Sequence, residues 1–190
     1  MNAKRHLTGI AVAALLIAGP AGAEKLSRAV VDVDSIEHES GVGRILFRAD
    51  LNTGDENVAV RRVLLRVPLG ELELSRDMTL RVHPVTTVWT RGNVDWSTGW
   101  TRPGGDFDDL SRGRAEVSSG SRGEMIFDIT LLAEEIIGHG APNRGFILTI
   151  APDQGLGLPA ADLLALRSLS GATVQIEYRR RPPTPRRIGG

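Results

Sequence analysis

The sequence contains no cysteine, which excludes disulfides, thiolate metal sites and cysteine-based catalysis. Aromatic residues make up only 4% of the 190 residues, and nearly all of the 23 basic residues are arginine. These are balanced by 23 acidic residues, which argues against nucleic acid as a specific partner. A composition of 41% hydrophobic and 24% charged residues is typical of one globular domain.

No apolar run is long enough to cross a bilayer, which takes about 20 residues. The N-terminus instead has the three parts of a secretory signal peptide. Lys4 and Arg5 are followed by an apolar run over residues 7–19 and by the cleavage pattern Ala21-Gly-Ala23. We expect residues 1–23 to be removed on export, which leaves no transmembrane anchor and a net charge of −2. The predicted location is secreted, either extracellular or periplasmic.

Hydrophobic residues alternate with polar ones along much of the chain, which predicts short antiparallel strands with one buried and one polar face. Such rows occur around residues 44–51, 62–69, 78–83, 124–129, 146–150 and 173–178. Turn-forming residues separate them at 52–55, 103–106 and 118–121.

A short helix is predicted from Thr130, as its cap, to Gly138, with a further helical turn within residues 160–166. The predicted fold class is all-β, an antiparallel β-sandwich with one short helix.

Seven motifs follow one another in a characteristic order. They are Arg44-Ile-Leu-Phe-Arg-Ala-Asp-Leu51, Val60-Arg-Arg-Val-Leu-Leu-Arg-Val67, Leu80-Arg-Val-His-Pro-Val-Thr-Thr-Val-Trp89 with Asn93-Val-Asp-Trp96, Pro103-Gly-Gly-Asp-Phe107, Phe127-Asp-Ile-Thr130, Pro142-Asn-Arg-Gly-Phe-Ile-Leu148 and Val174-Gln-Ile-Glu-Tyr178. This set resembles the DNRLRE domain, also called the disaggregatase-related repeat. The resemblance implies a jelly-roll-like β-sandwich, similar to carbohydrate-binding modules of secreted and cell-surface proteins.

The expected organisation has four parts. Residues 1–23 are the signal peptide, and residues 24–43 are an N-terminal lead-in in which the family's usual opening is not visible. Residues 44–178 form the DNRLRE-like β-sandwich. Residues 179–190 form a tail rich in arginine and proline, with no core residue, which we expect to be disordered.

Basic side chains fall on the polar faces of three successive predicted strands, at Arg44, Arg48, Arg62, Arg66, Arg81 and His83. If these strands share a sheet, their side chains form a basic strip that binds carboxylate or sulfate through bidentate hydrogen bonds. The alternatives are an ordinary solvated face and a strip scattered over opposite sheets.

The loop after these strands supplies Trp100 and Arg102 as further candidate ligand-binding residues, because an aromatic face packs well against a sugar ring. The resemblance places the neighbouring Trp89 and Trp96 at core positions.

Asp106, Asp108 and Asp109 lie in a glycine-containing loop and are candidate Ca²⁺ ligands, since this ion prefers carboxylate oxygens. Their spacing is not that of an EF-hand. The alternative is that these carboxylates accept backbone N–H groups within the loop. No other cofactor is expected.

The sequence has no H-E-x-x-H, G-x-S-x-G, Walker or G-x-G-x-x-G motif, so no catalytic residue is assigned. We expect a secreted, non-catalytic module that binds an extracellular glycan, and an acidic one if the basic strip forms. The first alternative is a cell-surface adhesion or assembly module that binds a protein or the cell envelope. The second is a polysaccharide-degrading enzyme.

Overall fold

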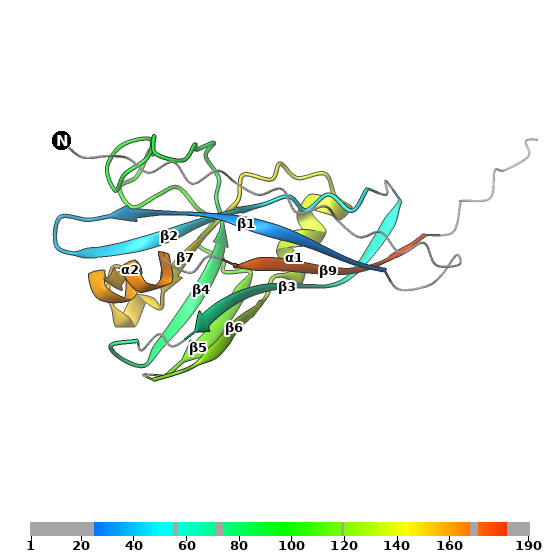
Figure 1. Ribbon diagram of the computed structural model, residues 1–190. Helices are drawn as coiled ribbons and strands as arrows, with labels where there is room; N and C mark the ends of the chain where they lie inside the picture. Colours follow the sequence, from blue (N-terminus) through cyan, green and yellow to red (C-terminus); the bar gives the residue numbers. More distant parts are fainter. Residues whose placement is uncertain (1–24, 55–56, 71–73, 119, 168–170, 182–190) are drawn as a thin grey trace, which may run out of the picture.

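The computed structural model describes residues 25–54, 57–70, 74–118, 120–167 and 171–181 (Figure 1). The chain forms two antiparallel β-sheets that enclose one large hydrophobic core, so the predicted all-β sandwich is confirmed. The predicted signal peptide and residues 182–190 of the predicted tail lie outside the described residues.

Each sheet is built mainly from four strands, and we name the sheets after one strand in each. The β3 sheet contains, in spatial order, β1 (Lys25–Glu37), β9 (Thr173–Arg180), β3 (Val58–Gly70) and β6 (Gly123–Asp128). The β4 sheet contains β2 (Val42–Ala49), β7 (Phe146–Ile150), β4 (Met78–Pro84) and β5 (Gly113–Val117). The two-residue strand β8 (Leu158–Pro159) pairs with the start of β2.

Strand β1 joins the two sheets. Its first half pairs with β9, and its second half pairs with β2. Apart from the short β8, the described strands are eight in two sheets, and most successive strands lie in opposite sheets, which is the predicted jelly-roll-like arrangement. Strands β2, β3 and β4, which follow one another in the sequence, therefore do not lie side by side.

The alternation of hydrophobic residues places six strands correctly, namely β2, β3, β4, β6, β7 and β9. It did not predict β1 or β5. The sandwich begins at Lys25 rather than at residue 44, because the segment treated as a lead-in forms β1. Val31 of this strand is buried in the core, and Val33 packs against it.

The C-terminal boundary also differs from the predicted one. Arg179 and Arg180 continue strand β9 instead of beginning a disordered tail. Ala59 and Val58 of β3 are their partners in the sheet. Backbone pairing is sufficient to extend the strand here, although neither arginine side chain is buried.

Aromatic side chains pack in the core between the two sheets. Phe47 of β2 and Phe146 of β7 stack with their ring centroids 5.7 Å apart. Tyr178 is fully buried, and its hydroxyl donates a hydrogen bond to the carbonyl oxygen of Thr53 at 3.1 Å. A buried phenol needs such a partner, so this bond fixes the loop after β2 against the end of β9.

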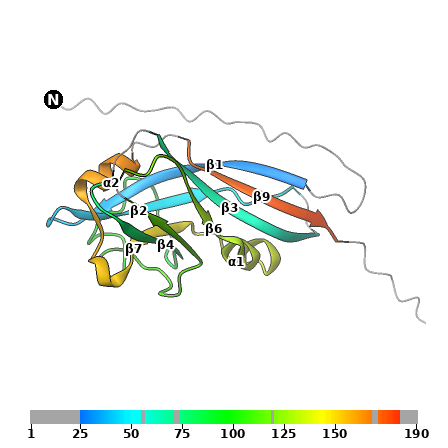
Figure 2. The ribbon, with the colours of Figure 1, turned by 90° about the horizontal axis from the view of Figure 1, so that it is seen from below.

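Short helices cover different ends of the sandwich (Figure 2). Helix α1 (Thr130–Ala133) continues into the π-helical turn η1 (Glu134–Gly138), and helix α2 (Ala160–Arg167) follows the 3₁₀ turn η2 (Pro152–Gln154) and β8. Both helical predictions are confirmed, but Thr130 is not the cap residue. Its hydroxyl instead accepts a hydrogen bond from the backbone N–H of Val63, at 2.9 Å, and so ties the helix to β3.

The outer face of the β4 sheet carries a second, smaller hydrophobic cluster. Its buried members are Ile36, Leu46, Val85, Trp89, Trp96 and Ile147. The segment between β4 and β5 folds back over this face and contributes both tryptophans. The β4 sheet is therefore covered on both sides, and the covering segment forms raised surfaces beside the strands of its outer face.

Candidate functional site

The predicted basic strip is divided between the two sheets. Arg62 and Arg66 lie on β3, whereas the other members lie on β2 and β4 in the opposite sheet. The six side chains therefore cannot form one continuous surface, and the scattered arrangement is the one observed.

The two arginines of the predicted strip that lie on β3 are paired with acidic neighbours. Arg66 Nη1 forms an ion pair with Glu124 Oε2 at 2.5 Å, and Arg66 Nε donates to Gln175 Oε1 at 3.2 Å. Arg62 Nε lies 3.9 Å from Asp128 Oδ2. These are exposed pairs of the kind found on any solvated sheet face, and they leave little unbalanced charge for a ligand.

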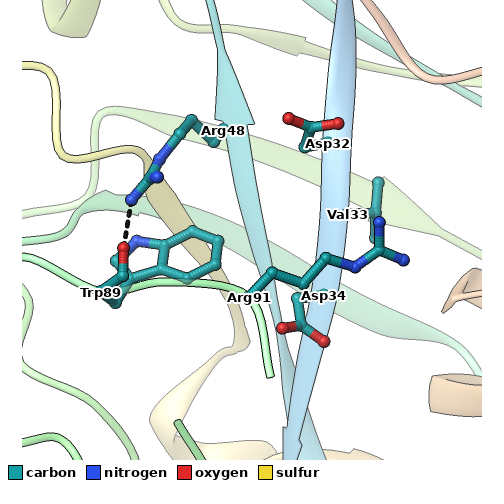
Figure 3. Close-up of a pocket in the computed structure, with 6 residues that line it drawn as sticks. All are labelled: Asp32, Val33, Asp34, Arg48, Trp89 and Arg91. Atoms are coloured by element: carbon teal, nitrogen blue, oxygen red, sulfur yellow. Dashed lines mark hydrogen bonds between the residues drawn. The ribbon is translucent and has the colours of Figure 1, made fainter. Parts of the chain in front are cut away.

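Arg48 on β2 is held by Trp89 (Figure 3). Its guanidinium lies 4.5 Å from the centroid of the indole, and Nη2 donates to the Trp89 carbonyl oxygen at 2.5 Å. These two residues line a small pocket of about 110 Å³ together with Asp32, Asp34 and Arg91. The guanidinium of Arg48 is therefore engaged by contacts within the fold.

The guanidinium of Arg44 is also engaged by contacts within the fold. Its guanidinium lies between the rings of Trp96 and Phe107, 5.0 Å from each centroid. Nη1 donates to the Gly104 carbonyl at 2.6 Å, and Nη2 donates to the Leu156 carbonyl at 3.2 Å. Burial, and next the charge of nearby Arg102, lower the pKa of Arg44.

Gly104 allows the loop to approach Arg44 this closely. It has a φ of 88°, and a Cβ atom at this position would lie 2.9 Å from Arg44 Nη1. Arg44 thus fixes the loop between β4 and β5 to the loop after β7, and its Nε is buried with no hydrogen-bond partner among the described residues. We assign Arg44 a positioning role rather than contact with a ligand.

The three tryptophans do not form a sugar-stacking platform. Trp89 and Trp96 are buried in the second cluster, as the resemblance implies. Trp100 packs against the same cluster, and its Nε1 donates to the Asp95 carbonyl at 2.8 Å. Arg102 is exposed and donates to the Phe107 carbonyl at 3.2 Å. Neither Trp100 nor Arg102 lines the groove described below.

The aspartates of the loop do not converge on one point. Asp106 is buried, and its carboxylate accepts hydrogen bonds from the hydroxyls of Thr87 and Thr101 and from the backbone N–H groups of Thr101 and Arg102. Burial alone would raise the pKa of Asp106, but these donors outweigh it and lower the pKa to about 2. Asp106 therefore organises the loop, as in the alternative given for it above.

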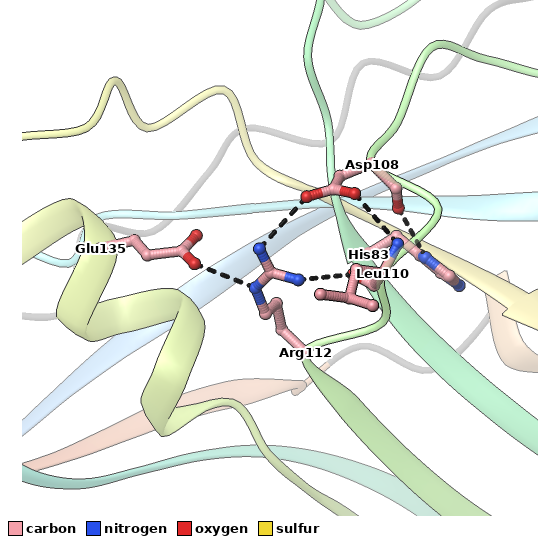
Figure 4. A network of polar contacts seen from close by, with 5 residues as sticks. All are labelled: His83, Asp108, Leu110, Arg112 and Glu135. Atoms are coloured by element: carbon pink, nitrogen blue, oxygen red, sulfur yellow. Dashed lines mark hydrogen bonds and ion pairs between the residues drawn. The ribbon is translucent and has the colours of Figure 1, made fainter.

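Asp108 belongs to a separate network (Figure 4). Its carboxylate pairs with Arg112 at 3.1 Å, and Arg112 also pairs with Glu135 of η1 at 3.0 Å. The Asp108 carbonyl accepts a hydrogen bond from His83 Nδ1 at 2.8 Å. Across the described residues, no cluster of three or more metal-ligating side chains occurs, so the three aspartates do not form a calcium site.

A groove of about 350 Å³ crosses the outer face of the β4 sheet. Its lining includes Arg81, His83, Phe107, Asp109, Thr149 and Leu156. Two of the predicted ligand-binding residues, Arg81 and His83, thus come together there, with Arg44 in the wall. Asp109 is the third predicted metal ligand, and it lies on the rim as a single carboxylate.

Arg81 is the free cation of this groove. It is half-buried on β4, and its side chain makes no ion pair or hydrogen bond with any residue that the structure describes. Thr149 is its partner in the pairing with β7 and provides a polar floor beside it. An unpaired guanidinium in a groove is a ready binding group for a carboxylate or sulfate.

His83 lines the groove and has one ring nitrogen that is bonded within the fold. The residue is only 4% exposed, and its ring lies 5.0 Å from the ring of Phe107. Because Nδ1 donates to the Asp108 carbonyl, Nε2 is the nitrogen that changes protonation. Burial is the main cause that lowers the pKa of His83, and the charges of Arg81 and Arg44 lower it further, against Asp109 and the Asp108 carbonyl.

Sequence reasoning missed six of the ten residues that line the groove, including Thr149, Phe107 and Leu156. Thr149 is the polar residue within the hydrophobic run of β7, so the alternation contained a signal for it. Phe107 lies within a motif of the resemblance but was not selected. Leu156 lies between two glycines in a loop, and no local pattern indicates that it reaches the groove.

Comparison with known proteins does not assign this chain to a family: no family model matches it, and no curated protein matches it in sequence. Over the described part of the chain, no helix has the length and apolar character needed to cross a membrane.

Proposed function

We propose that this protein is an exported, non-catalytic binding module for an anionic extracellular glycan, bound in the groove of the β4 sheet. The observation that carries the proposal is the unpaired guanidinium of Arg81 inside the groove. A carboxylate or sulfate would replace the water around this guanidinium with two charge-assisted hydrogen bonds.

The other walls suit a sugar. Phe107 and Leu156 provide apolar surface for the C–H groups of a pyranose ring, and Thr149 provides a hydroxyl. Small-molecule sites commonly combine such apolar walls with a few polar groups that fix orientation. The proposal includes the resemblance to the DNRLRE domain, which implies a similarity to carbohydrate-binding modules.

The small number of carboxylates in the groove favours binding of a glycan over its hydrolysis. Among the described residues that line it, Asp109 is the single carboxylate. Glycoside hydrolysis generally uses a pair of carboxyl groups that flank the scissile bond.

An assembly module is the second candidate, and one observation favours it. Leu110 and Leu156 are 68% and 66% exposed in loops near the groove. Contiguous apolar patches are typical of surfaces that contact another macromolecule, and in this candidate function the two leucines would belong to such a patch. In that case the ligand would be a protein or an envelope component.

The test is calorimetric titration of the purified protein with glucuronate and galacturonate oligosaccharides, with neutral glucose oligosaccharides as the comparison. Arg81→Ala should weaken uronate binding about 10- to 100-fold, the range for charge-assisted hydrogen bonds. Arg62→Ala is the matched control, because it removes an exposed arginine from the opposite sheet. Equal affinity of the wild-type protein and Arg81→Ala for uronate would contradict the proposal, whereas silence toward every glycan would favour the assembly module.

A further inference from the structure

A second arginine lies directly opposite Arg81 on the outer face of the β4 sheet. Arg114 of β5 is the partner of Arg81 in the antiparallel pairing, so both side chains point to the same face. Their Cβ atoms are therefore separated by about 4.5–5.5 Å. Like charges placed opposite each other destabilise a sheet, so this pair costs stability unless an anion lies near it.

The charge of this pair is only partly balanced within the chain. Arg114 Nη2 forms an ion pair with Glu116 Oε1 at 2.6 Å, but the two side chains are 58% and 74% exposed. An exposed pair of this kind is weak and is screened by salt. Arg81 has no ion-pair partner among the described residues. The two arginines therefore lie on neighbouring strands, one lining the groove and the other at the adjacent edge strand.

Strand β5 is the edge strand of its sheet, as far as the described residues show. The row that runs across the strands from Thr149 through Arg81 thus reaches Arg114 at the edge, and no further strand of the described chain pairs beyond it. A ligand that lies across the strands advances by about 4.8 Å at each strand. This step is comparable to the distance from one sugar ring to the next in a linked chain.

We propose that Arg81 and Arg114 form two successive subsites for a polyanionic glycan chain, with one anionic group bound at each guanidinium. This inference rests on the proposed function, because the first subsite is the groove itself. It adds that the ligand is a chain with charges on adjacent sugars, bound across the edge of β5, rather than a single acidic sugar.

The experiment is a length series. Calorimetric titrations compare a methyl uronoside monomer with uronate oligomers of increasing length, at low salt, on the wild-type protein and three variants. Arg114→Ala removes the second subsite. Glu116→Gln removes the acid that competes for Arg114 while keeping nearly the same size. Arg62→Ala is again the control from the opposite sheet.

In the wild-type protein, the oligomers should bind about tenfold more tightly than the monomer, the value of one charge-assisted contact. Arg114→Ala should abolish most of this gain while leaving the affinity for the monomer unchanged. Glu116→Gln should increase the gain several-fold, and Arg62→Ala should leave it unaltered.

Two results would overturn the inference while leaving the proposed function intact. One is a wild-type protein that binds monomer and oligomers equally. The other is an Arg114→Ala protein that keeps the full gain with length. Failure of the proposed function has a different appearance, since the wild-type protein would then bind no uronate of any length, and the inference would fall with it. Arg114 is exposed, and a thermal melt of each variant checks that the fold is retained.

Discussion

Anion binding in the groove should become tighter as the pH falls, because His83 lies beside the proposed binding group. His83 and Arg81 are two residues apart on the same face of β4, which places them about 7 Å apart. His83 lines the groove and its Nδ1 is bonded to the Asp108 carbonyl, so Nε2 is the nitrogen that can take up a proton.

The sign follows from the charges. In the free protein, burial lowers the pKa of His83 below its ordinary value of 6.5, so the ring is neutral at neutral pH. A bound carboxylate favours the imidazolium and raises this pKa in the complex. Binding therefore takes up protons, so affinity is greatest below the pKa of the free protein, and the gain is lost as the pH rises through the pKa of the complex.

The size of the effect follows from Coulomb's law. Two unit charges about 7 Å apart attract by about 2 kcal/mol at an effective dielectric constant of about 20. Physiological salt, with a screening length of about 8 Å, reduces this to about 1 kcal/mol. The affinity should therefore rise about fivefold from neutral pH to a pH below the pKa of His83 in the free protein, with an uptake of about 0.4 proton at most.

The assay is calorimetric titration of a uronate oligomer in pairs of buffers with different heats of ionisation, which counts the protons taken up. His83→Asn is the matched variant, because its amide can still donate to the Asp108 carbonyl but does not titrate in this range. This variant should bind with the same affinity at both pH values. The reasoning is refuted if the wild-type protein takes up no proton, or if His83→Asn keeps the full pH dependence.

Two further predictions concern the loops that shape the groove. Arg44→Ala should lower the free energy of unfolding by about 2–4 kcal/mol in urea denaturation, because two aromatic contacts and two hydrogen bonds to carbonyls are lost. A loss below about 0.5 kcal/mol would show that this arginine does not hold the loops together. Asp106→Ala should cost about 2–4 kcal/mol at neutral pH, because four donors lose their acceptor. Since the pKa of Asp106 is lowered from 3.8 to about 2, its contribution is complete above pH 3.8 and is lost as the pH falls through about 2. An Asp106→Ala protein that is destabilised equally at neutral pH and below pH 2 would contradict this account.

Much of the fold follows from local sequence patterns. Strand β4 alternates buried Met78, Leu80 and Val82 with more exposed residues, and the sequence shows this row directly. Strand β1 carries the same signal at Val31 and Val33, but the row is short and lies within a polar segment, so it does not stand out from a loop. Strand β5 has only Ala115 and Val117 as apolar residues, which is too short a row to separate from a loop.

The site could be predicted only in part, because sheet membership is not a local property. Arg62 and Arg81 look alike in sequence, since each is the polar member of an alternating strand. The jelly-roll-like topology sends one to the β3 sheet and the other to the β4 sheet. The same topology brings Thr149 beside Arg81, although the two residues are 68 positions apart in the sequence.

Burial by a distant loop also cannot be read from the strands themselves. Arg44 and Arg48 lie on a polar face by the alternation of β2, and both were candidate ligand-binding residues. The segment after β4 covers this face with Trp89, Trp96 and Phe107, so that both arginines are occupied by aromatic rings. Arg81 remains available because no acidic or carbonyl group of the described chain reaches it.

The most direct test of the central claim, that Arg81 binds an anionic sugar in the groove of the β4 sheet, is NMR mapping of a uronate oligomer on the isotope-labelled protein. The account predicts that the largest shifts occur at the guanidinium of Arg81, the ring of His83 and the methyl groups of Leu156, with the signals of Arg62 and Arg66 unchanged. Shifts confined to the pocket beside Arg48, or to the β3 sheet, would contradict it.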